Sequence, residues 1–480
     1  MSHYLTTIGL EIHLQLSTKT KAFCGCKNSF GGKPNTSVCP VCLGLPGSLP
    51  VLNSQYLSYA IKVALALSSN ISDRMKFDRK NYFYPDLPKN YQISQYDMPL
   101  SLGGYVDIVR DDKPKRIGIT RVHMEEDAGK LIHSKSRPSS YVDFNRTGTP
   151  LLEIVSEPDM SSPEEAYQYL IAVKSILKYL DVSDCNMEEG SLRCDANISI
   201  RPKGQKELGT KVELKNMNSF KGVRDALIYE EKRQARALLA GESIIQQTRL
   251  WNEQKQVSES MRTKEAAHDY RYFPDPDLLL FTIDAALVDE IRLTLPEMPE
   301  KKKERFIKDC GLSEYDASVL VSDRSMSNFF EFCMKLYPES KAIVNWLTGD
   351  ILKHLNANNL EFSDAKLTPQ HLVGMLKLID NNTISGKIAK EVLSDMLLTG
   401  NSADDIIQDK GLIQISDEGA IEKLACEVVN ENPKVADDYL SGKTNALGFL
   451  VGQLMKKSKG KANPQLANLA IKKRLDRKRA

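Results

Sequence analysis

Strict alternation of apolar and polar positions marks the chain up to about residue 295. In TTIGLEIHLQL every second residue is apolar, namely Ile8, Leu10, Ile12 and Leu14. This period is typical of a β-strand with one buried face, and it predicts further strands in YVDIV, RIGITRVHM, YVDF, PLLEIV, ANISI and TKVELK. Helical period occurs over residues 53–68 and again after Ser162, which precedes a proline as a helix cap often does. The pattern predicts an α+β fold around a largely antiparallel sheet.

The pattern changes after Pro296 and Pro299. From there, nearly every segment has helical period, for example LTPQHLVGMLKLID and TISGKIAKEVLSDML. A second break is expected around 401–413, in the polar stretch NSADDIIQDKGL. We therefore predict three parts, of which the last two are helical: 1–294, 295–405 and 406–480.

Composition and charge narrow the class of protein. The 480 residues are 41% hydrophobic and 27% charged, with a formal net charge of 65 − 63 = +2. These values are ordinary for a globular protein and do not indicate a globally basic nucleic-acid binder. The sequence contains neither an uninterrupted apolar stretch of membrane-spanning length nor a signal-peptide pattern at MSHYLTTIGLEIH. We expect a cytoplasmic protein in which the nine cysteines do not form a disulfide framework.

Motifs of several other enzyme classes are missing from the sequence. SGKT at 441–444 ends like a phosphate loop, but the glycine that such a loop needs is replaced by Asp437. The sequence has neither a GxSxG motif nor a Gly/Ser-rich amidase loop. We therefore expect that the chain does not hydrolyse glutamine itself.

Four cysteines form two close pairs near the N-terminus. CGC at 24–26 and CPVC at 39–42 contain Cys24, Cys26, Cys39 and Cys42. Two such knuckles can place four thiolates tetrahedrally around Zn²⁺, and a site with four protein ligands is structural. The alternatives are four free cysteines or a redox CxxC motif. Because paired knuckles are far more specific than one CxxC, we predict zinc.

Several acids interrupt otherwise apolar strands. Glu11 and His13 share one strand face, Glu125 and Glu126 are adjacent in RVHMEEDAGK, and Glu153 lies within PLLEIV. Carboxylates with an imidazole suit Mg²⁺, whose shell is usually completed by phosphate oxygens and water. For any single acid, exposure to solvent is the simpler interpretation. The sequence alone does not show that they converge.

Three other segments are rich in polar or basic residues. Alternating polar residues follow MEEG, and they form either an ATP site or the solvent-exposed face of a sheet. These residues are Arg193, Asp195, Asn197, Lys211, Glu213 and Lys215. The loop FDRKNYFYPDLPKNYQISQYD at 77–97 has the composition of a substrate pocket, although from its residues alone a packing role is favoured. The last 25 residues contain ten Lys or Arg and one Asp, which indicates tRNA phosphate contacts or a solvated helix.

Long motifs in a fixed order resemble one family. The motifs are IGLEIHLQL, KFDRKNYFYPDLPKNYQISQYD, RIGITRVHMEEDAGK, NRTGTPLLEIVSEPDM, MEEGSLRCDANIS and ELKNMNSF. They follow the order of the GatB family, the B subunits of the bacterial GatCAB amidotransferases. The resemblance extends to the C-terminal part through DYRYFPDPDL, KLTPQHLVGMLKLI, GLIQISD and GFLVGQLMKKSKGKANPQL. It implies a cradle related to the cores of glutamine synthetase and guanidino kinases, then a helical domain and a YqeY-like tail that binds tRNA.

The resemblance also implies a reaction. ATP phosphorylates the side-chain carboxylate of Glu or Asp on a misacylated tRNA, and ammonia then displaces the phosphate. This is a carbon–nitrogen ligase reaction with glutamine as the amide donor. In the family, an amidase (the A subunit) releases the ammonia and a small C subunit braces the pair. The implied assembly is therefore a heterotrimer that acts on Glu-tRNA(Gln) or Asp-tRNA(Asn).

Residue roles follow from the same resemblance. The Mg²⁺ ligands of the family correspond to Glu11, His13, Glu126 and Glu153, with Glu125 beside them. The resemblance leaves open which of the adjacent residues Glu125 and Glu126 is the direct ligand. Tyr82 and Lys89 resemble pocket or ammonia-channel residues. The implied nucleotide side consists of Glu189, Ser191, Arg193, Asp195, Asn197 and Lys211.

Two other functions remain as alternatives. A stand-alone ATP-dependent ligase acting on a small molecule would turn over ATP without tRNA, but it leaves the basic tail unexplained. A zinc-bearing RNA-binding scaffold would tolerate alanine at Glu11, His13 or Glu153.

Overall fold

The computed structural model describes residues 3–111, 113–134, 137–261, 270–412, 418–441, 443, 445–458, 462 and 464–479. Parts of the motifs DYRYFPDPDL, GLIQISD, SGKT and GFLVGQLMKKSKGKANPQL lie outside these ranges. The chain divides into two compact units, Met1–Pro299 and Glu300–Ala480, which are described one at a time. The three parts expected from the sequence, with borders at 294/295 and 405/406, stay predictions.

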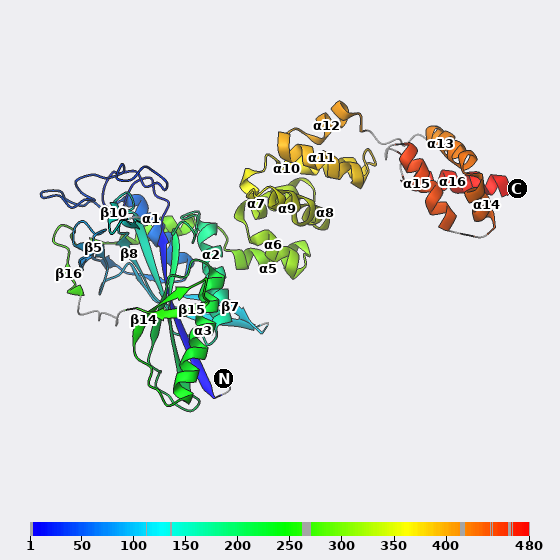
Figure 1. Ribbon diagram of the computed structural model, residues 1–480. Helices are drawn as coiled ribbons and strands as arrows, with labels where there is room; N and C mark the ends of the chain where they lie inside the picture. The colour runs from blue at the N-terminus through cyan, green and yellow to red at the C-terminus, as the bar shows by residue number, and fades with distance from the viewer. Residues whose placement is uncertain are drawn as a thin grey trace. The chain divides into compact units, whose positions relative to one another are not determined.

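The first unit is built on one large sheet (Figure 1). Its strands are β1 (Tyr4–Gln15), β2 (Asn70–Ile71), β6 (Ser101–Leu102), β7 (Tyr105–Arg110), β8 (Lys113–Glu126), β11 (Pro150–Ser156), β12 (Leu192–Pro202), β13 (Val212–Lys215), β14 (Gln247–Asn252) and β15 (Val257–Ser260). Among the described residues, the order is β15-β14-β13-β12-β1-β11-β8-β6-β2, and β7 also pairs with β8. All pairs are antiparallel except β13 with β14. The predicted largely antiparallel sheet is confirmed.

Shorter strands surround this sheet. They pair as β3 (Arg74–Met75) with β17 (Phe281–Thr282), β4 (Asp78–Asn81) with β5 (Tyr91–Ser94) and β16 (Phe273–Pro274), and β9 (Lys130–His133) with β10 (Ser140–Asp143).

The helices of the first unit are α1 (Ser54–Ala66), α2 (Pro163–Leu180), α3 (Phe220–Leu239) and α4 (Ala285–Leu293). Two of them confirm the predicted starts. Asn53 caps α1 by accepting hydrogen bonds from the backbone of Gln55 and Tyr56, and Ser162 caps α2 by accepting one from Glu165.

The two faces of the sheet have opposite character. The apolar residues of β1, Ile8, Leu10, Ile12 and Leu14, are all buried in one core with residues of α1, α2 and α3, and Figure 1 shows α2 and α3 beside the sheet. Because successive strand residues point to opposite faces, the polar residues of β1 point away from this core. The polar face therefore collects side chains that the core excludes.

A bulge in β8 reverses the phase of that strand. Ile119 is paired with Ser156 of β11, whereas Arg121 is paired with Val155, which leaves Thr120 without a counterpart. Before the bulge the buried apolar residues have odd numbers, as with Ile117, and after it they have even numbers, as with Val122. The bulge thus decides which residues at the end of β8 join the polar face.

The second unit is helical in its described residues. Its elements are α5 (Pro299–Cys310), α6 (Glu314–Val321), α7 (Arg324–Leu336), α8 (Ser340–Asn345), a π-helical turn (Trp346–Ile351), α9 (Leu352–Ala357), a 3-10 turn (Phe362–Asp364), α10 (Pro369–Asp380), α11 (Gly386–Thr399), α12 (Ala403–Lys410), α13 (Glu418–Glu431), α14 (Pro433–Leu440), α15 (Asn445–Lys457) and α16 (Pro464–Arg479). The helices α13 to α16 share a hydrophobic core of their own. The change to helical structure that the sequence predicts is confirmed. Among the described helices, none has the length and apolar character needed to cross a membrane.

Candidate functional site

One histidine and two glutamates converge on the polar face of the sheet. His13 of β1 is paired with Glu153 of β11, and Glu125 comes from the end of β8. The His13 Nε2 atom lies 3.4 Å from Glu153 Oε2 and 3.6 Å from Glu125 Oε1. One ligand atom from each residue fits within 4.8 Å of the others, which is close enough to share a cation. Three strands of one sheet hold this acid cluster, so its geometry is set by strand register.

His123 belongs to the same cluster, although it was not among the residues expected from the sequence. It is paired with Glu153 across β8 and β11, and its Nε2 atom lies 3.2 Å from Glu153 Oε2 and 3.8 Å from Glu125 Oε2. Its Nδ1 atom is buried without a hydrogen-bond partner in the described structure. The sequence contained the signal, because His123 is two residues before Glu125 and therefore shares its face.

Opposite charges set the protonation of the acid cluster. Burial alone would lower the pKa of His123, but Glu153 and Glu125 raise it to about 9. Burial would likewise raise the pKa of Glu153, yet His123 and His13 hold it well below its usual value. Without a cation, the carboxylates are balanced by imidazolium protons, and a divalent cation can take the place of those protons.

Glu126 is not part of the acid cluster, so the structure does not bring it together with the other expected Mg²⁺ ligands His13 and Glu153. As the neighbour of Glu125 in a strand, it points to the opposite face. There its carboxylate forms a buried ion pair with Lys89 and accepts a hydrogen bond of 3.0 Å from the backbone N–H of Ile93. The structure therefore places Glu125, and not Glu126, next to His13.

Glu11 lies on the face of the acid cluster but has a different neighbour. It is two residues before His13 in β1, and its Oε1 atom accepts a hydrogen bond of 2.9 Å from Asn197 Nδ2. It extends the acidic surface toward β12, outside the three-residue group of His13, Glu125 and Glu153.

The predicted nucleotide residues are divided between the polar face and its margin. Asn197, Asp195 and Arg193 point from β12 to the face of the acid cluster, since they are paired with Gly9, Glu11 and His13 of β1. Arg193 forms an ion pair of 2.9 Å with Asp127, and Lys215 forms one with Asp195.

The other three predicted nucleotide residues lie at the margin of the polar face. Glu189 lies in an exposed turn, and Lys211 is exposed just before β13. Ser191 is buried and contributes its backbone carbonyl to Gln15. In the described part of the chain, no hydrogen bond or ion pair joins Glu189 or Lys211 to the acid cluster.

Aromatic residues and one lysine stand close to the acid cluster. The Lys80 ammonium lies 5.9 Å from the ring centre of Tyr82 and 5.0 Å from that of Tyr270. Burial alone would lower the pKa of Lys80, but the negative charge of Glu125 raises it above its usual value. Lys80 was not expected from the sequence, because a lysine in a short strand gives no signal of its surroundings.

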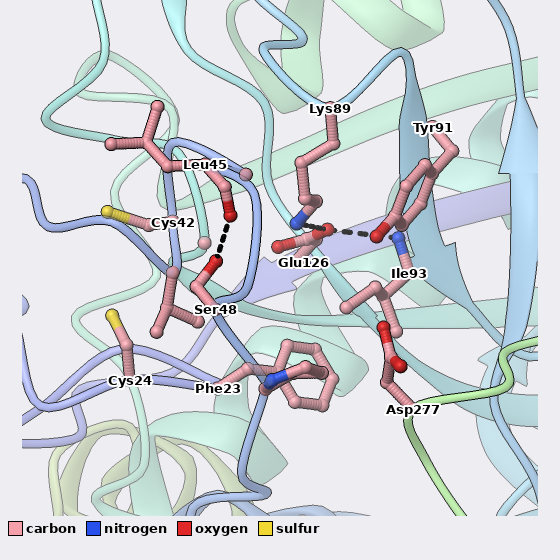
Figure 2. Close-up of a pocket in the computed structure, with 14 residues that line it drawn as sticks. Phe23, Cys24, Cys42, Leu45, Ser48, Lys89, Tyr91, Ile93, Glu126 and Asp277 are labelled. Carbon is pink, nitrogen blue, oxygen red and sulfur yellow. Dashed lines mark hydrogen bonds and ion pairs between the residues drawn. The ribbon is translucent and has the colours of Figure 1, made fainter.

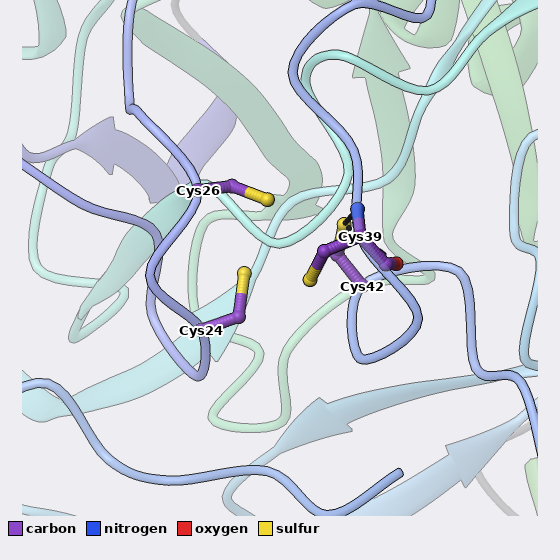
Figure 3. Close-up of side chains that lie close together, drawn as sticks. All are labelled: Cys24, Cys26, Cys39 and Cys42. Atoms are coloured by element: carbon purple, nitrogen blue, oxygen red, sulfur yellow. Dashed lines mark hydrogen bonds between the residues drawn. The ribbon is translucent and has the colours of Figure 1, made fainter.

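The four predicted zinc ligands come together (Figure 3). The sulfur atoms of Cys24, Cys26, Cys39 and Cys42 all lie within 4.8 Å of one another. A tetrahedral zinc site with metal–sulfur bonds of about 2.3 Å needs sulfur atoms about 3.8 Å apart. Hydrogen bonding from the Cys24 thiol, with the N–H of Cys39 and the charge of Lys21, lowers the pKa of Cys42 to about 5. The donor set therefore fits a thiolate-binding metal.

A pocket of about 190 Å³ lies beside the four cysteines. Figure 2 shows Cys24 and Cys42 on one side of it and the Lys89–Glu126 pair on the other. Ser48, Tyr91 and Asp277 complete the polar part of its lining. The pocket and the acid cluster thus lie on opposite sides of the end of β8, with Glu126 facing one and Glu125 the other.

Two family models together match most of the chain. The GatB/GatE catalytic domain family matches residues 6–289, and a GatB domain matches residues 328–475. A protein of Caldanaerobacter subterraneus subsp. tengcongensis, named as the B subunit of aspartyl/glutamyl-tRNA(Asn/Gln) amidotransferase, is 56% identical over 474 residues, which are 99% of this chain and 100% of the relative.

Two further relatives have the same name. The protein of Carboxydothermus hydrogenoformans is 54% identical over 99% of both chains. That of Brevibacillus brevis is 53% identical over 99% of this chain and its own full length. With more than half of the residues identical along the whole chain, this protein belongs to the GatB family.

Proposed function

We propose that this chain is the B subunit of an aspartyl/glutamyl-tRNA amidotransferase, which amidates Glu-tRNA(Gln), Asp-tRNA(Asn) or both. The full-length similarity supports this assignment. The acid cluster of His13, Glu125 and Glu153 is the single local observation that carries the chemistry. Ionised carboxylates with imidazole on the polar face of the sheet are suitable ligands for Mg²⁺, which in turn binds the phosphates of a nucleotide.

The reaction needs the side-chain carboxylate to become a better electrophile. In the proposed mechanism, ATP phosphorylates the carboxylate of the tRNA-bound Glu or Asp, and ammonia then displaces phosphate to give the amide. When bound, Mg²⁺ offsets the charge of the transferring phosphoryl group. His13, Glu125 and Glu153 would hold it, and Glu11 extends the negative surface toward the nucleotide side.

The cations around the acid cluster position the anionic substrates in this proposal. Arg193, Lys215 and Lys80 lie on the polar side of β12, β13 and β4, where they can contact phosphate oxygens. Asp127 holds Arg193 in place through their 2.9 Å ion pair. Ser191, Asp195 and Asn197 complete the nucleotide side, with Glu189 and Lys211 at its edge.

Ammonia comes from a partner in the proposed assembly. The sequence has no glutaminase motif, so an amidase supplies the ammonia as the A subunit, and a small C subunit completes a heterotrimer. The pocket beside Lys89, and Tyr82 nearer the acid cluster, form the path on this chain. An enclosed path keeps ammonia from being protonated before it meets the acyl phosphate.

Zinc and tRNA complete the proposal. The four cysteines would hold a Zn²⁺ ion whose role would be structural, because the protein would supply all four ligands. The first unit has the cradle architecture of glutamine synthetase and guanidino kinases, and a YqeY-like tail follows a helical domain. The basic helix α16 of the tail contacts tRNA phosphates.

ADP formation tests the proposal. The assay uses the co-expressed complex with ammonium chloride in place of glutamine, with and without misacylated Glu-tRNA(Gln), and compares the parent with Glu153→Gln. Glu207→Gln is the matched control, because Glu207 is an exposed acid between β12 and β13. We expect ADP only with misacylated tRNA, and its loss in Glu153→Gln alone.

Two outcomes would contradict the proposal. ADP formation that does not depend on tRNA would favour a stand-alone ligase. Unchanged turnover in folded Glu153→Gln would exclude the acid cluster as the site of activation.

A further inference from the structure

The Lys89 side chain crosses directly over a glycine of the cysteine segment. A Cβ atom added to Gly44 would lie 2.4 Å from Lys89 Cγ and 3.3 Å from both Lys89 Cβ and Cδ. Such a distance is far below van der Waals contact, and the clash involves the stem of the lysine. Gly44 also has a φ of +66°, a conformation that side chains rarely adopt. This position therefore lets the lysine stem lie against the loop backbone.

The backbone turn that presents two of the cysteines also fixes Gly44. The N–H groups of Leu43, Gly44 and Leu45 donate to the carbonyls of Cys39, Val41 and Pro40 over 3.0, 3.0 and 2.9 Å. The Cys39 N–H in addition lies 3.1 Å from Cys42 Sγ. A metal held by Cys39 and Cys42 would thus hold the surface on which the Lys89 stem rests.

One glycine lies between Glu126, the partner of Lys89, and the cysteine segment. A Cβ atom on Gly148 would lie 3.5 Å from Cys42 Cβ and 3.8 Å from Glu126 Oε2, so this glycine fills the space between them. The Gly148 carbonyl accepts a hydrogen bond of 2.8 Å from the N–H of Ala22, two residues before Cys24. Lys89 is therefore packed against the segment that carries the four cysteines, and Glu126 is linked to the same segment through Gly148.

The ion pair is buried and so depends on this packing. The side chains of Lys89 and Glu126 are 7% and 3% exposed. A buried pair of this kind persists only where the surrounding structure keeps the two charges together. The turn at Gly44 covers the lysine, and the three described atoms nearest to a Cβ added at Gly44, apart from those of its chain neighbours, all belong to Lys89.

We propose that the four-cysteine metal site positions the Lys89–Glu126 ion pair. Metal bound at the cysteines keeps the turn of residues 39–45 against the Lys89 stem, which keeps the ammonium on Glu126. When the metal is lost, the turn loosens, Lys89 leaves Glu126, and the pocket of Figure 2 changes shape. The coupling itself does not require the proposed amidation, whereas its consequence for ammonia delivery rests on that proposed function.

The first experiment compares the full chain with and without metal. Amine-reactive labelling is followed by mass spectrometry, with zinc present, removed by a chelator, and restored. We expect the labelling rate of Lys89 to rise about tenfold without zinc and to return with it, because a charged hydrogen bond of ordinary strength no longer holds the amine. Lys115 is the internal reference, since it pairs with Glu165 outside the cysteine segment.

The second experiment leaves the metal in place. Gly44→Ala is compared with Gly47→Ala, which lies in the same loop with a φ of +85° but has nothing within 4 Å of the added Cβ. Both variants carry the same kind of backbone strain, so only the contact with Lys89 differs. We expect faster Lys89 labelling in Gly44→Ala alone.

The outcomes separate the coupling from the proposed function. Unchanged Lys89 labelling on zinc removal, or equal labelling in the two glycine variants, would overturn the coupling. Because labelling uses neither ATP nor tRNA, that result would leave the amidation proposal standing. If amidation failed while the labelling behaved as expected, only the proposed function would be lost.

Discussion

The hydroxyl of Tyr56 lies 2.8 Å from the backbone carbonyl oxygen of Glu125. The same hydroxyl is 2.7 Å from the carbonyl of Leu151, which faces Glu125 in the β8–β11 ladder. Tyr56 is fully buried in α1. One hydroxyl therefore ties a helix of the core to the two strands that carry Glu125 and Glu153.

Loss of this hydroxyl should weaken both folding and cation binding. Tyr56→Phe removes the single hydroxyl proton that two buried carbonyls share. We therefore expect a loss of about 1–3 kcal/mol in the free energy of unfolding, measured by denaturant titration, and weaker binding of Mn²⁺ as a probe of the proposed Mg²⁺ site. Tyr169→Phe is the matched control, because the Tyr169 hydroxyl is buried without a hydrogen-bond partner in the described structure. Equal losses in the two variants would contradict a positioning role for Tyr56.

The two adjacent glutamates at the end of β8 should behave differently when changed. We expect Glu125→Gln to reduce the affinity for Mn²⁺ by about tenfold or more, because it removes one charge from the acid cluster. Glu126→Gln should leave that affinity nearly unchanged, because its carboxylate faces Lys89. Calorimetric titration of each variant with Mn²⁺ decides the matter, and the reverse order of effects would refute the assignment.

Glu165 predicts a pH-dependent term in stability. Burial would raise its pKa, but hydrogen bonds from Lys115 and the Ser161 N–H, each within 2.7 Å, lower it. A carboxyl group with a lowered folded-state pKa contributes stability that is complete above its unfolded-state pKa of about 4.3. That stability is lost as the pH falls through the folded-state value.

The corresponding variant should lose this pH dependence. We expect Glu165→Gln to be less stable than the parent at pH 7, and the difference in unfolding free energy to shrink as the pH falls below about 4. Glu164→Gln serves as the control, because Glu164 is mostly exposed and its ion pair with Arg224 is longer, at 3.4 Å. A difference that stays constant with pH would show that the charge of Glu165 contributes nothing.

Metal analysis checks the cysteine site directly. We expect about one zinc per chain in the purified protein, its loss in Cys42→Ser, and a fall of several degrees in the unfolding temperature with that loss. Cys185→Ser is the control, since Cys185 is also a buried free cysteine but lies outside the group of four. A parent protein that retains no zinc or other thiolate-binding metal after expression in zinc-containing medium would refute the metal site.

Local patterns predicted much of the first unit. The alternation in β1 correctly identified the core residues Ile8, Leu10, Ile12 and Leu14. It therefore also identified which side chains of that strand share the polar face. The capping residues Asn53 and Ser162 marked the helix starts. The cysteine spacing indicated a shared site, because two close pairs need little backbone between them to meet.

Relationships between distant segments were harder to predict. The choice between Glu125 and Glu126 depends on the phase of β8, which the bulge at Thr120 reverses, although the apolar residues Val122 and Met124 contain that information. The contact of Gly44 with Lys89 joins two loops without any periodic pattern. Such contacts depend on tertiary packing, and no local preference predicts them.

The bulge in β8 has a further consequence for changes of chain length. Ile119 and Arg121 pair with the consecutive residues Ser156 and Val155, so Thr120 is the extra residue of the β8–β11 ladder. Deleting Thr120 alone would therefore restore a regular ladder with β11 without turning either half of β8 over. His123 and Glu125 would stay on the polar face, so the acid cluster would survive the loss of this exposed residue.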